Sequence, residues 1–268
     1  MRAKKSLGQN FLVDEGVAGR IVGALGPRAD ETIVEVGAGR GALTERLLEV
    51  AGRVVAIEFD RDLAPVLRVK FGLRDNFVLV EADALEVDFC NVVAPAPSAR
   101  VVANLPYNIS TAILQRLIAQ RRCITEMILM LQREVVERIA APAGSSERGF
   151  LSVVVEAYCE VETLFDVEPR AFRPVPKVWS TVARLTPRTV PAFEAADEKL
   201  LWRVVSAGFA QRRKTILNNL RSAPEDLRAL VEASGGAATL LESAAVNPQR
   251  RAETLELDEW AAITRALS

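Results

Sequence analysis

Short runs rich in β-branched residues alternate with amphipathic segments over the first two-thirds of the chain, and this alternation constrains the fold most. The strand-like runs are Thr32–Val36, Val54–Glu58, Phe77–Glu81, Arg100–Asn104 and Met127–Leu131. The helix-like segments between and after them are Ala42–Val50, Asp62–Phe71, Thr111–Gln120 and Glu134–Ala141. Strands that are apolar on both faces and separated by helices indicate a parallel sheet covered on each side. The sequence therefore predicts an α/β fold.

Two further strand-like runs follow, and after them the pattern becomes purely helical. Glu160–Val167 and Trp179–Leu185 come after a helical stretch near Phe150–Glu156, and such a hairpin could add an antiparallel edge to the sheet. Past Thr186-Pro187 the expected helices are Asp197–Phe209, Lys214–Arg221, Pro224–Ala233, Ala237–Ala244 and Leu257–Leu267. We therefore expect a sheet-containing domain over residues 1–188 and a small all-helical domain over residues 189–268.

The residue types present exclude several kinds of chemistry. The chain has no histidine, which rules out Ser-His and Cys-His nucleophilic systems, histidine general bases and imidazole metal ligands. Cys90, Cys123 and Cys159 are far apart and form no CxxC pair, so we expect no zinc site and no disulfide, but buried thiols in a reducing compartment. No apolar run resembles a signal peptide or a membrane span, so we expect a cytoplasmic protein.

Basic residues gather locally although the formal net charge is −1. The opening segment carries Arg2, Lys4 and Lys5. The stretch from Arg203 to Arg221 contains no acid, and its other basic residues are Arg212, Arg213 and Lys214. Phosphate contacts need a basic face rather than a basic protein, so this stretch is a candidate nucleic-acid surface. A solvated helix face is the alternative.

The first expected strand ends in a glycine-rich turn, Glu35–Gly41, that opens into a helix. Glycines there let the backbone approach a ligand closely, and Gly37, Gly39 and Ala42 also satisfy the GxGxxG/A pattern of dinucleotide-binding proteins. Glu58, at the end of the second strand, can accept hydrogen bonds from ribose hydroxyls of either NAD or S-adenosylmethionine. A methyltransferase, a nicotinamide enzyme and a purely structural turn all remain open at this point.

The third expected strand ends at Asp83, which extends this row of polar strand ends. Its carboxylate could accept a hydrogen bond from an adenine amino group, because the carboxyl ends of parallel strands line the ligand crevice of an open sheet. Capping of the following segment is the structural alternative.

The fourth expected strand leads into Asn104-Leu105-Pro106-Tyr107, the most informative stretch of the chain. The exocyclic amine of adenine is a poor nucleophile, and methylating it requires two acceptors that hold its N–H groups and aim the nitrogen lone pair. Asn104 offers its amide oxygen, and the Leu105 carbonyl offers a second acceptor because Pro106 restricts that residue to an extended conformation. Tyr107 offers an aromatic face on which a base could stack. A simple turn after a strand is the alternative.

Taken together, these motifs resemble the KsgA/RsmA family of ribosomal RNA adenine dimethyltransferases, and its Erm and mitochondrial transcription factor B relatives. The motifs that carry the resemblance, in family order, are Lys5–Leu12, Glu35–Gly41, Glu58, Asp83, Asn104–Tyr107, Arg173–Ser180 preceded by Phe172, and Gln211–Leu220. The N-terminal segment departs from the pattern, because relatives often carry a longer basic arm with an aromatic there. This departure weakens the case for RNA contacts from that end.

The resemblance implies a Rossmann-like class I S-adenosylmethionine methyltransferase with a C-terminal helical domain. It implies that the cofactor is held by Asn10, Leu12, Gly37, Glu58, Asp83 and Asn104. It implies that the target adenine is held by Asn104, Tyr107 and Phe172, although Phe172 could also be a core aromatic. Leu105 and Pro106 complete the expected catalytic set. Arg212, Arg213 and Lys214 would bind RNA.

The implied substrate is a pair of adjacent adenines in a hairpin loop near the 3′ end of 16S rRNA in the small ribosomal subunit or its precursor. The resemblance implies no metal and no membrane, and we expect a monomer. An Erm-type methyltransferase of large-subunit RNA, a non-catalytic RNA-binding assembly factor and a nicotinamide oxidoreductase are the alternatives. The oxidoreductase lacks a proton-transfer residue and does not explain Asn104–Tyr107.

Overall fold

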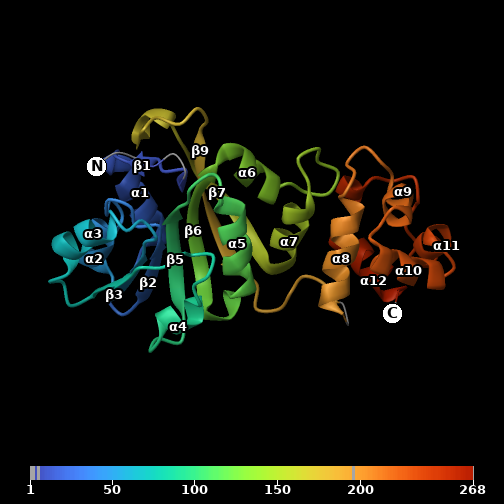
Figure 1. The fold of residues 1–268 in the computed structure, drawn as a ribbon, viewed down its shortest axis with the longest axis horizontal. Coiled ribbons are helices and arrows are strands. Elements are labelled where there is room, and N and C mark those ends of the chain that lie inside the picture. Colours follow the sequence, from blue (N-terminus) through green and yellow to red (C-terminus); the bar gives the residue numbers. More distant parts are fainter. Residues whose placement is uncertain (1–3, 5–6, 195–196, 268) are drawn as a thin grey trace. The chain divides into compact units, whose positions relative to one another are not determined.

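A computed structural model describes residue 4 and residues 7–194 and 197–267 of the chain. Arg2, Lys5 and Ser6 of the sequence motifs lie outside the described residues. The chain divides into two compact units (Figure 1). The N-terminal unit comprises Met1–Val136 and Glu160–Pro187, and the C-terminal unit comprises Glu137–Cys159 and Arg188–Ser268. The proposed functional domains, 1–188 and 189–268, have different bounds because residues 137–159 group with the C-terminal helices.

The N-terminal unit is built around the predicted sheet. Its seven strands lie in the order β4-β3-β2-β5-β6-β9-β7. They are β2 (Thr32–Val36), β3 (Arg53–Ile57), β4 (Phe77–Val80), β5 (Ala99–Asn104), β6 (Ile124–Gln132), β7 (Cys159–Val167) and β9 (Ser180–Pro187). The first five are parallel neighbours, and β9 pairs antiparallel with β6. The predicted α/β class and the late antiparallel strand are both confirmed.

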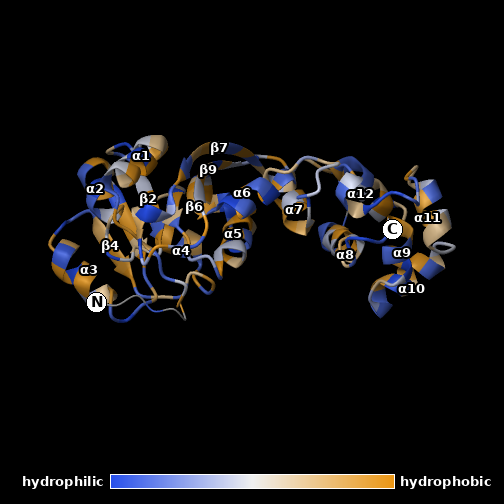
Figure 2. Ribbon diagram, turned by 90° about the horizontal axis from the view of Figure 1, so that it is seen from above, coloured by the Kyte–Doolittle hydropathy of each residue, from blue (hydrophilic) through white to orange (hydrophobic). Residues whose placement is uncertain are grey.

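Helices cover the apolar sheet. Those that connect the parallel strands are α2 (Thr44–Val50), α3 (Ala64–Phe71), α4 (Phe89–Val93) and α5 (Ser110–Ala119). The helix α1 (Glu15–Leu25) precedes β2, and α6 (Arg133–Ile139) follows β6. Every residue of β2 is buried, as expected for a central strand with helices on both sides. Figure 2 shows that the helices carry both hydrophobic and hydrophilic residues, as covering helices must. This packing fixes the strand ends that carry the predicted site.

A small second sheet was not predicted from the sequence. It pairs β1 (Phe11–Leu12) antiparallel with β8 (Phe172–Arg173), with Leu12 opposite Phe172. These strands are only two residues long, so no alternation of hydrophobic and polar residues could reveal them. The pairing holds the N-terminal segment against the segment that precedes β9 (Figure 1).

The expectation that all three cysteines are free thiols was wrong. Cys90 and Cys123 form a disulfide with their Cα atoms 5.4 Å apart, and Cys159 is a buried cysteine outside this disulfide. The side chain of Gln120, at the end of α5, accepts from the Phe89 N–H at 2.7 Å and donates to the Val87 carbonyl at 3.1 Å. This brings α4 beside the 3-10 turn of Cys123, a contact between distant segments that cysteine spacing does not encode.

The C-terminal unit consists of helices and turns in its described part. Its elements are α7 (Phe150–Tyr158), α8 (Glu198–Gly208), α9 (Ile216–Arg221), α10 (Glu225–Ala233), α11 (Ala237–Ser243) and α12 (Leu257–Arg265). Trp260 is fully buried at its core, and the buried Arg148 donates to the Ala141 carbonyl and to Glu156. Among the described residues, no helix has the length and apolar character required to traverse a bilayer.

Candidate active site

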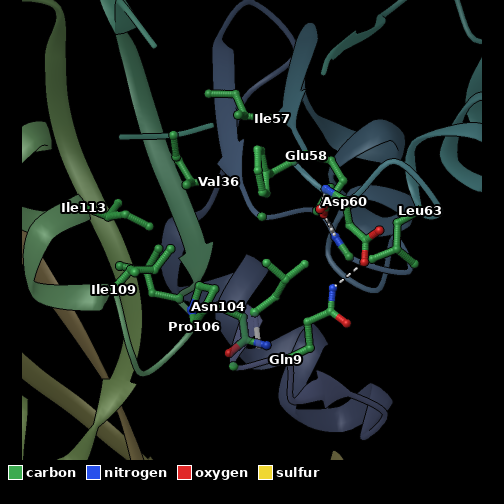
Figure 3. A pocket seen from close by; sticks show the side chains of 18 of the residues that line it. Gln9, Val36, Ile57, Glu58, Asp60, Leu63, Asn104, Pro106, Ile109 and Ile113 are labelled. Carbon is green, nitrogen blue, oxygen red and sulfur yellow. Dashed lines mark hydrogen bonds between the residues drawn. The ribbon is translucent and has the colours of Figure 1, made fainter. Parts of the chain in front are cut away.

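A cavity of about 310 Å³ lies at the carboxyl ends of the parallel strands in the N-terminal unit (Figure 3). Glu58 and Asp60 line one side, while Asn104, Pro106 and Ile113 line the opposite side. Gln9 of the N-terminal segment lines a third side. Such crevices at strand ends are the usual ligand sites of open α/β sheets. Of the residues predicted to bind the cofactor, all six line this cavity: Asn10, Leu12, Gly37, Glu58, Asp83 and Asn104.

The glycine-rich turn and Glu58 form one connected structure. Gly37 and Gly39 have φ values of 74° and 59°, a left-handed conformation that glycine adopts at little cost. The Gly39 N–H donates to Glu58 Oε2 at 2.7 Å, and the Asp60 N–H donates to Glu58 Oε1 at 2.8 Å. A carboxylate has further lone pairs, so both oxygens can also accept ligand hydroxyls. Burial raises the pKa of Glu58 above its ordinary value, and these backbone donors oppose that rise.

A second buried carboxyl group, Glu35, lies beneath the turn. Thr44, the first residue of α2, donates its hydroxyl to Glu35 Oε2 at 2.5 Å. Burial raises the pKa of Glu35 to about 8, and the nearby Glu58 adds to the rise while the Thr44 bond opposes it. A carboxyl group with this pKa is largely protonated at neutral pH, which avoids burying a second full charge beside Glu58.

The N-terminal segment is tied across the cavity by Asp60. Lys4 Nζ lies 2.5 Å from Asp60 Oδ1 and 2.6 Å from Asp62 Oδ2. Gln9 Nε2 donates to Asp60 Oδ2 at 2.7 Å (Figure 3). Burial acts to raise the pKa of Asp60, but the bonds from Lys4 and Gln9 hold it below its ordinary value. Sequence reasoning missed Lys4, Gln9 and Asp60, because their pairing spans more than fifty positions and follows no local spacing.

Asn104 lies at the end of β5 with its amide held in one orientation. Its Nδ2 donates to the backbone carbonyl of Asn10 at 3.2 Å. This bond uses the N–H side of the amide and leaves the Oδ1 side as the acceptor. The following Leu105 is buried, and its N–H donates to the Met130 carbonyl at 3.2 Å on the neighbouring strand β6. The two predicted acceptor residues are therefore fixed to different neighbours.

Tyr107 is anchored to the strand β9. Its hydroxyl lies 2.7 Å from the hydroxyl of Ser180, which is completely buried. Burial raises the pKa of the Tyr107 phenol, so the ring stays neutral in the physiological range. Tyr107 and Pro106 both line the cavity. Ser180 was not singled out as a site residue from the sequence.

Asp83 both lines the cavity and forms a local turn bond, the two possibilities that the sequence left open. Its Oδ1 accepts from the Leu85 N–H at 2.9 Å, the local turn bond that the structural alternative predicted. The residue also lines the cavity, where its carboxylate can accept from a ligand as well. Phe59 lines the same region with 57% of its surface exposed, and sequence reasoning missed it. The sequence feature that could have identified Phe59 is its position directly after Glu58.

Phe172 lies away from the cavity lining. Its side chain is completely buried and packs in the cluster that contains Leu12, Ala171 and Val182. The structure therefore supports the alternative interpretation of a core aromatic. Phe172 is connected to the site by its backbone pairing with Leu12, which lines the cavity.

The predicted basic residues Arg212, Arg213 and Lys214 are exposed in the C-terminal unit. They lie in a turn before α9, whereas the sequence placed Lys214 within the helix. Thr215 explains the difference, because its side chain caps α9 by accepting from the Asn218 N–H, so the helix begins at Ile216, two residues later than expected. Arg212 also donates to the Ser146 carbonyl. The described residues contain no cluster of His, Cys, Asp and Glu that could hold a metal ion.

Comparison with protein families gives a match over almost the entire chain. The family model described as ribosomal RNA adenine dimethylase covers residues 1–265. A ribosomal RNA small subunit methyltransferase A from Hahella chejuensis is 45% identical over 262 residues, covering 98% of this chain and 92% of the relative. The protein of the same description from Pseudomonas aeruginosa is 45% identical over 269 residues, covering 100% of this chain and 95% of that one.

Solved structures share the same architecture. A dimethyladenosine transferase from Plasmodium falciparum superposes with a TM-score of 0.77, at 23% identity over 94% of this chain and 95% of that chain. At this identity the likeness shows the fold alone. A 23S rRNA methyltransferase, ErmE, superposes with a TM-score of 0.68, at 29% identity over 96% of this chain and 99% of that chain.

Proposed function

The chain belongs to the ribosomal RNA adenine dimethylase family, and from this premise we propose that it converts two adjacent adenines of small-subunit ribosomal RNA to N6,N6-dimethyladenosine. The proposed targets lie in a hairpin loop near the 3′ end of 16S rRNA, in the small subunit or its precursor. The methyl donor is S-adenosylmethionine. The observation that carries the proposal is the orientation of Asn104, whose amide oxygen is left to accept from an exocyclic amine.

The cavity fits this methyl donor in its polar groups. Glu58 is a buried carboxylate beside a glycine turn, suited to ribose hydroxyls, and Asp83 is an acceptor suited to an adenine amino group. Phe59 offers an exposed ring for a base, and the segment from Asn10 to Leu12 closes another side. When bound, S-adenosylmethionine supplies an electrophilic methyl group whose sulfur leaves as a neutral thioether. No strong base is therefore required of the protein.

The catalytic role of the chain is to grip the acceptor amine. In the first transfer, Asn104 Oδ1 and the Leu105 carbonyl hold the two N–H groups, which draws the nitrogen toward a tetrahedral shape and aims its lone pair. The nitrogen gains the methyl carbon as the carbon–sulfur bond breaks, and one amine proton is released to solvent. In the second transfer, one N–H group remains for these acceptors to hold. Pro106 restricts the Leu105 backbone so that its carbonyl stays extended toward the site. Tyr107 presents its ring to the base, and Ser180 fixes the tilt of that ring through the hydroxyl contact of 2.7 Å. Phe172 supports this site through β8 rather than touching the base.

The C-terminal residues 189–268 contribute RNA contacts in this proposal. Arg212, Arg213 and Lys214 are exposed cations that suit phosphate groups. Bases in a hairpin loop can be splayed out and stacked at modest cost, which suits a site that must reach an exocyclic amine. We propose that a monomer acts in the cytoplasm, where small subunits assemble.

Methylation of separated ribosomal subunits tests the substrate. Small and large subunits from cells that lack the modification are incubated with the protein and S-adenosylmethionine carrying a labelled methyl group. We expect labelled N6,N6-dimethyladenosine in small-subunit RNA only. The likeness to the 23S rRNA methyltransferase ErmE supports one alternative, a large-subunit substrate, because 29% identity extends over nearly the whole chain. Product in large-subunit RNA alone would overturn the proposal in favour of this alternative.

A further inference from the structure

The segment between β8 and β9 exposes an unusual amount of apolar surface. Val175 is 55% exposed, Val178 is 38% exposed and Trp179 is 41% exposed. An exposed tryptophan side chain indicates a binding surface, because tryptophan contributes strongly to the free energy of binding when a partner covers it. We call residues 173–179, from the last residue of β8 to the residue before β9, the tryptophan loop.

Both ends of the tryptophan loop are fixed to the active site. At its beginning, Phe172 pairs with Leu12, which lines the cavity. At its end, Ser180 contacts the hydroxyl of Tyr107 at 2.7 Å, and the Trp179 carbonyl accepts from the Arg133 N–H at 3.0 Å. Figure 1 shows the yellow segment near β9 on the same side of the N-terminal unit as the strand β1. The residues on either side of the loop are therefore linked to two residues of the cavity lining, Leu12 and Tyr107.

Cations accompany the exposed aromatic ring. The Arg133 guanidinium lies over the Trp179 ring, 4.8 Å from its centroid, and is held there by an ion pair with Asp166 at 2.6 Å. Lys177 and Arg173 are exposed on the loop itself. The Arg173 guanidinium donates to the Phe172 carbonyl at 2.8 Å, which fixes its position. An exposed aromatic ring beside exposed cations is the combination that binds single-stranded nucleic acid, through stacking and phosphate contacts.

We propose that Trp179 is a stacking platform for the RNA nucleotide next to the target adenine, with Lys177 and Arg173 contacting the phosphates that flank it. This inference rests on the proposed function and deepens it. The platform lies outside the cavity, so it holds the RNA strand without touching the reacting amine. In a substrate with two adjacent adenines, it keeps one base ordered while Tyr107 and Asn104 hold the other.

Kinetics on small subunits that lack the modification provide the first test. Trp179→Ala is expected to raise KM for these subunits about tenfold. The kcat and the affinity for S-adenosylmethionine, measured by calorimetry, should stay close to wild type. Trp179→Phe, which keeps a stacking ring, should restore most of the lost affinity. Leu73→Ala is the matched control, because Leu73 is 99% exposed in the same unit and should leave KM unchanged. A Trp179→Ala variant with wild-type KM would overturn the platform while leaving the proposed function intact.

Tryptophan fluorescence with a single-stranded oligoadenylate tests the platform without any methyl transfer. Trp260 is fully buried and Trp202 donates to Tyr158 within an aromatic cluster, so Trp179 is the most accessible of the three indoles. We expect the oligonucleotide to quench a component of the emission that Trp179→Phe lacks. Such quenching in a protein that methylated no ribosomal subunit would support the platform and refute the proposed function. Equal quenching in wild type and Trp179→Phe would refute the platform.

Discussion

Lys4 and Asp60 join the start of the chain to the end of the second parallel strand, with 2.5 Å between Lys4 Nζ and Asp60 Oδ1. Asp60 is buried, whereas Lys4 is partly exposed, so the pair has one fixed and one mobile partner. The bond from Gln9 to the second oxygen of Asp60 strengthens the link. Because residues 7–12 line the cavity, we expect this link to affect how firmly the N-terminal segment covers a bound ligand.

Removing either partner should therefore weaken the retention of S-adenosylmethionine. We expect Lys4→Ala to raise the dissociation rate a few-fold, because a partly exposed ion pair contributes modestly. Asp60→Ala should raise it more, because it also removes the acceptor of Gln9 and of the Asp62 N–H. Stopped-flow displacement measures both rates. Arg28→Ala, which breaks an exposed ion pair with Asp30 elsewhere in the unit, should behave as wild type. Equal rates in wild type and Asp60→Ala would contradict this role.

Glu35 should make the stability of the protein depend on pH. Its pKa in the folded state, about 8, lies above the ordinary value of 4.5, so the folded protein holds a proton that the unfolded chain releases. The contribution is complete below pH 4.5 and is lost as the pH rises towards 8. Within that window, the free energy of unfolding should fall by up to about 1.4 kcal/mol per pH unit.

Urea unfolding of wild type and Glu35→Gln between pH 5 and pH 8 measures this effect. The glutamine keeps a carbonyl oxygen for the Thr44 hydroxyl but does not ionise. Its unfolding free energy should change less with pH than that of wild type. Glu58, whose pKa is also raised, is present in both proteins, so the difference between the two profiles reports Glu35 together with its coupling to Glu58. Parallel profiles would show that Glu35 is already ionised in the folded state.

The turn before α9 should carry a salt-dependent share of ribosome binding. Replacing Arg212, Arg213 and Lys214 together by alanine removes three cations. For each phosphate contact that is lost, the slope of log K for small-subunit binding against the logarithm of the salt concentration should become less negative by about one. Arg228→Ala is the matched control, because Arg228 pairs with Glu232 on a helix of the same unit. Binding to small subunits at several salt concentrations gives the slopes. An unchanged slope in the triple variant would exclude this turn as an RNA contact.

The Cys90–Cys123 disulfide determines how many cysteines of the unfolded protein react with an alkylating reagent. Protein prepared without reductant and unfolded with an alkylating reagent should take up one label, at Cys159. After reduction it should take up three, one for each cysteine of the chain. The Cys90→Ser variant should take up two labels without reduction, because Cys123 loses its partner. Intact-mass measurement counts the labels, and three labels in the unreduced wild type would contradict the pairing.

Features that depend on local sequence were predictable. The run Thr32–Val36 forms β2 with the predicted bounds, because it is apolar on both faces and ends at a glycine turn. The residues that follow β2, β3 and β5 are then expected to lie close together, because the carboxyl ends of parallel strands lie at the same edge of a sheet. This rule brought Gly37, Glu58 and Asn104 to the lining of one cavity.

Features that depend on contacts between distant segments were not predictable. The Lys4–Asp60 pair and the Cys90–Cys123 disulfide join residues that only the finished fold brings together. Phe172 illustrates the same limit, because an aromatic residue in a motif can face a substrate or the core, and here its ring is fully buried. The sheet formed by β1 and β8 decides this orientation, and its two-residue strands leave no pattern in the sequence.

Asn104 is the residue on which the proposed chemistry depends most, because its Nδ2 bond to the Asn10 carbonyl leaves the amide oxygen to hold the target amine. The most direct test compares wild type and Asn104→Ala in single turnovers, with S-adenosylmethionine and unmodified small subunits both at saturation. We expect the rate of N6-methyladenosine formation to fall by about a hundredfold or more, the range for removing one polar contact made in a transition state. S-adenosylmethionine binding, followed by calorimetry, should weaken less than tenfold. A variant that forms methylated adenine at the wild-type rate would contradict the central claim.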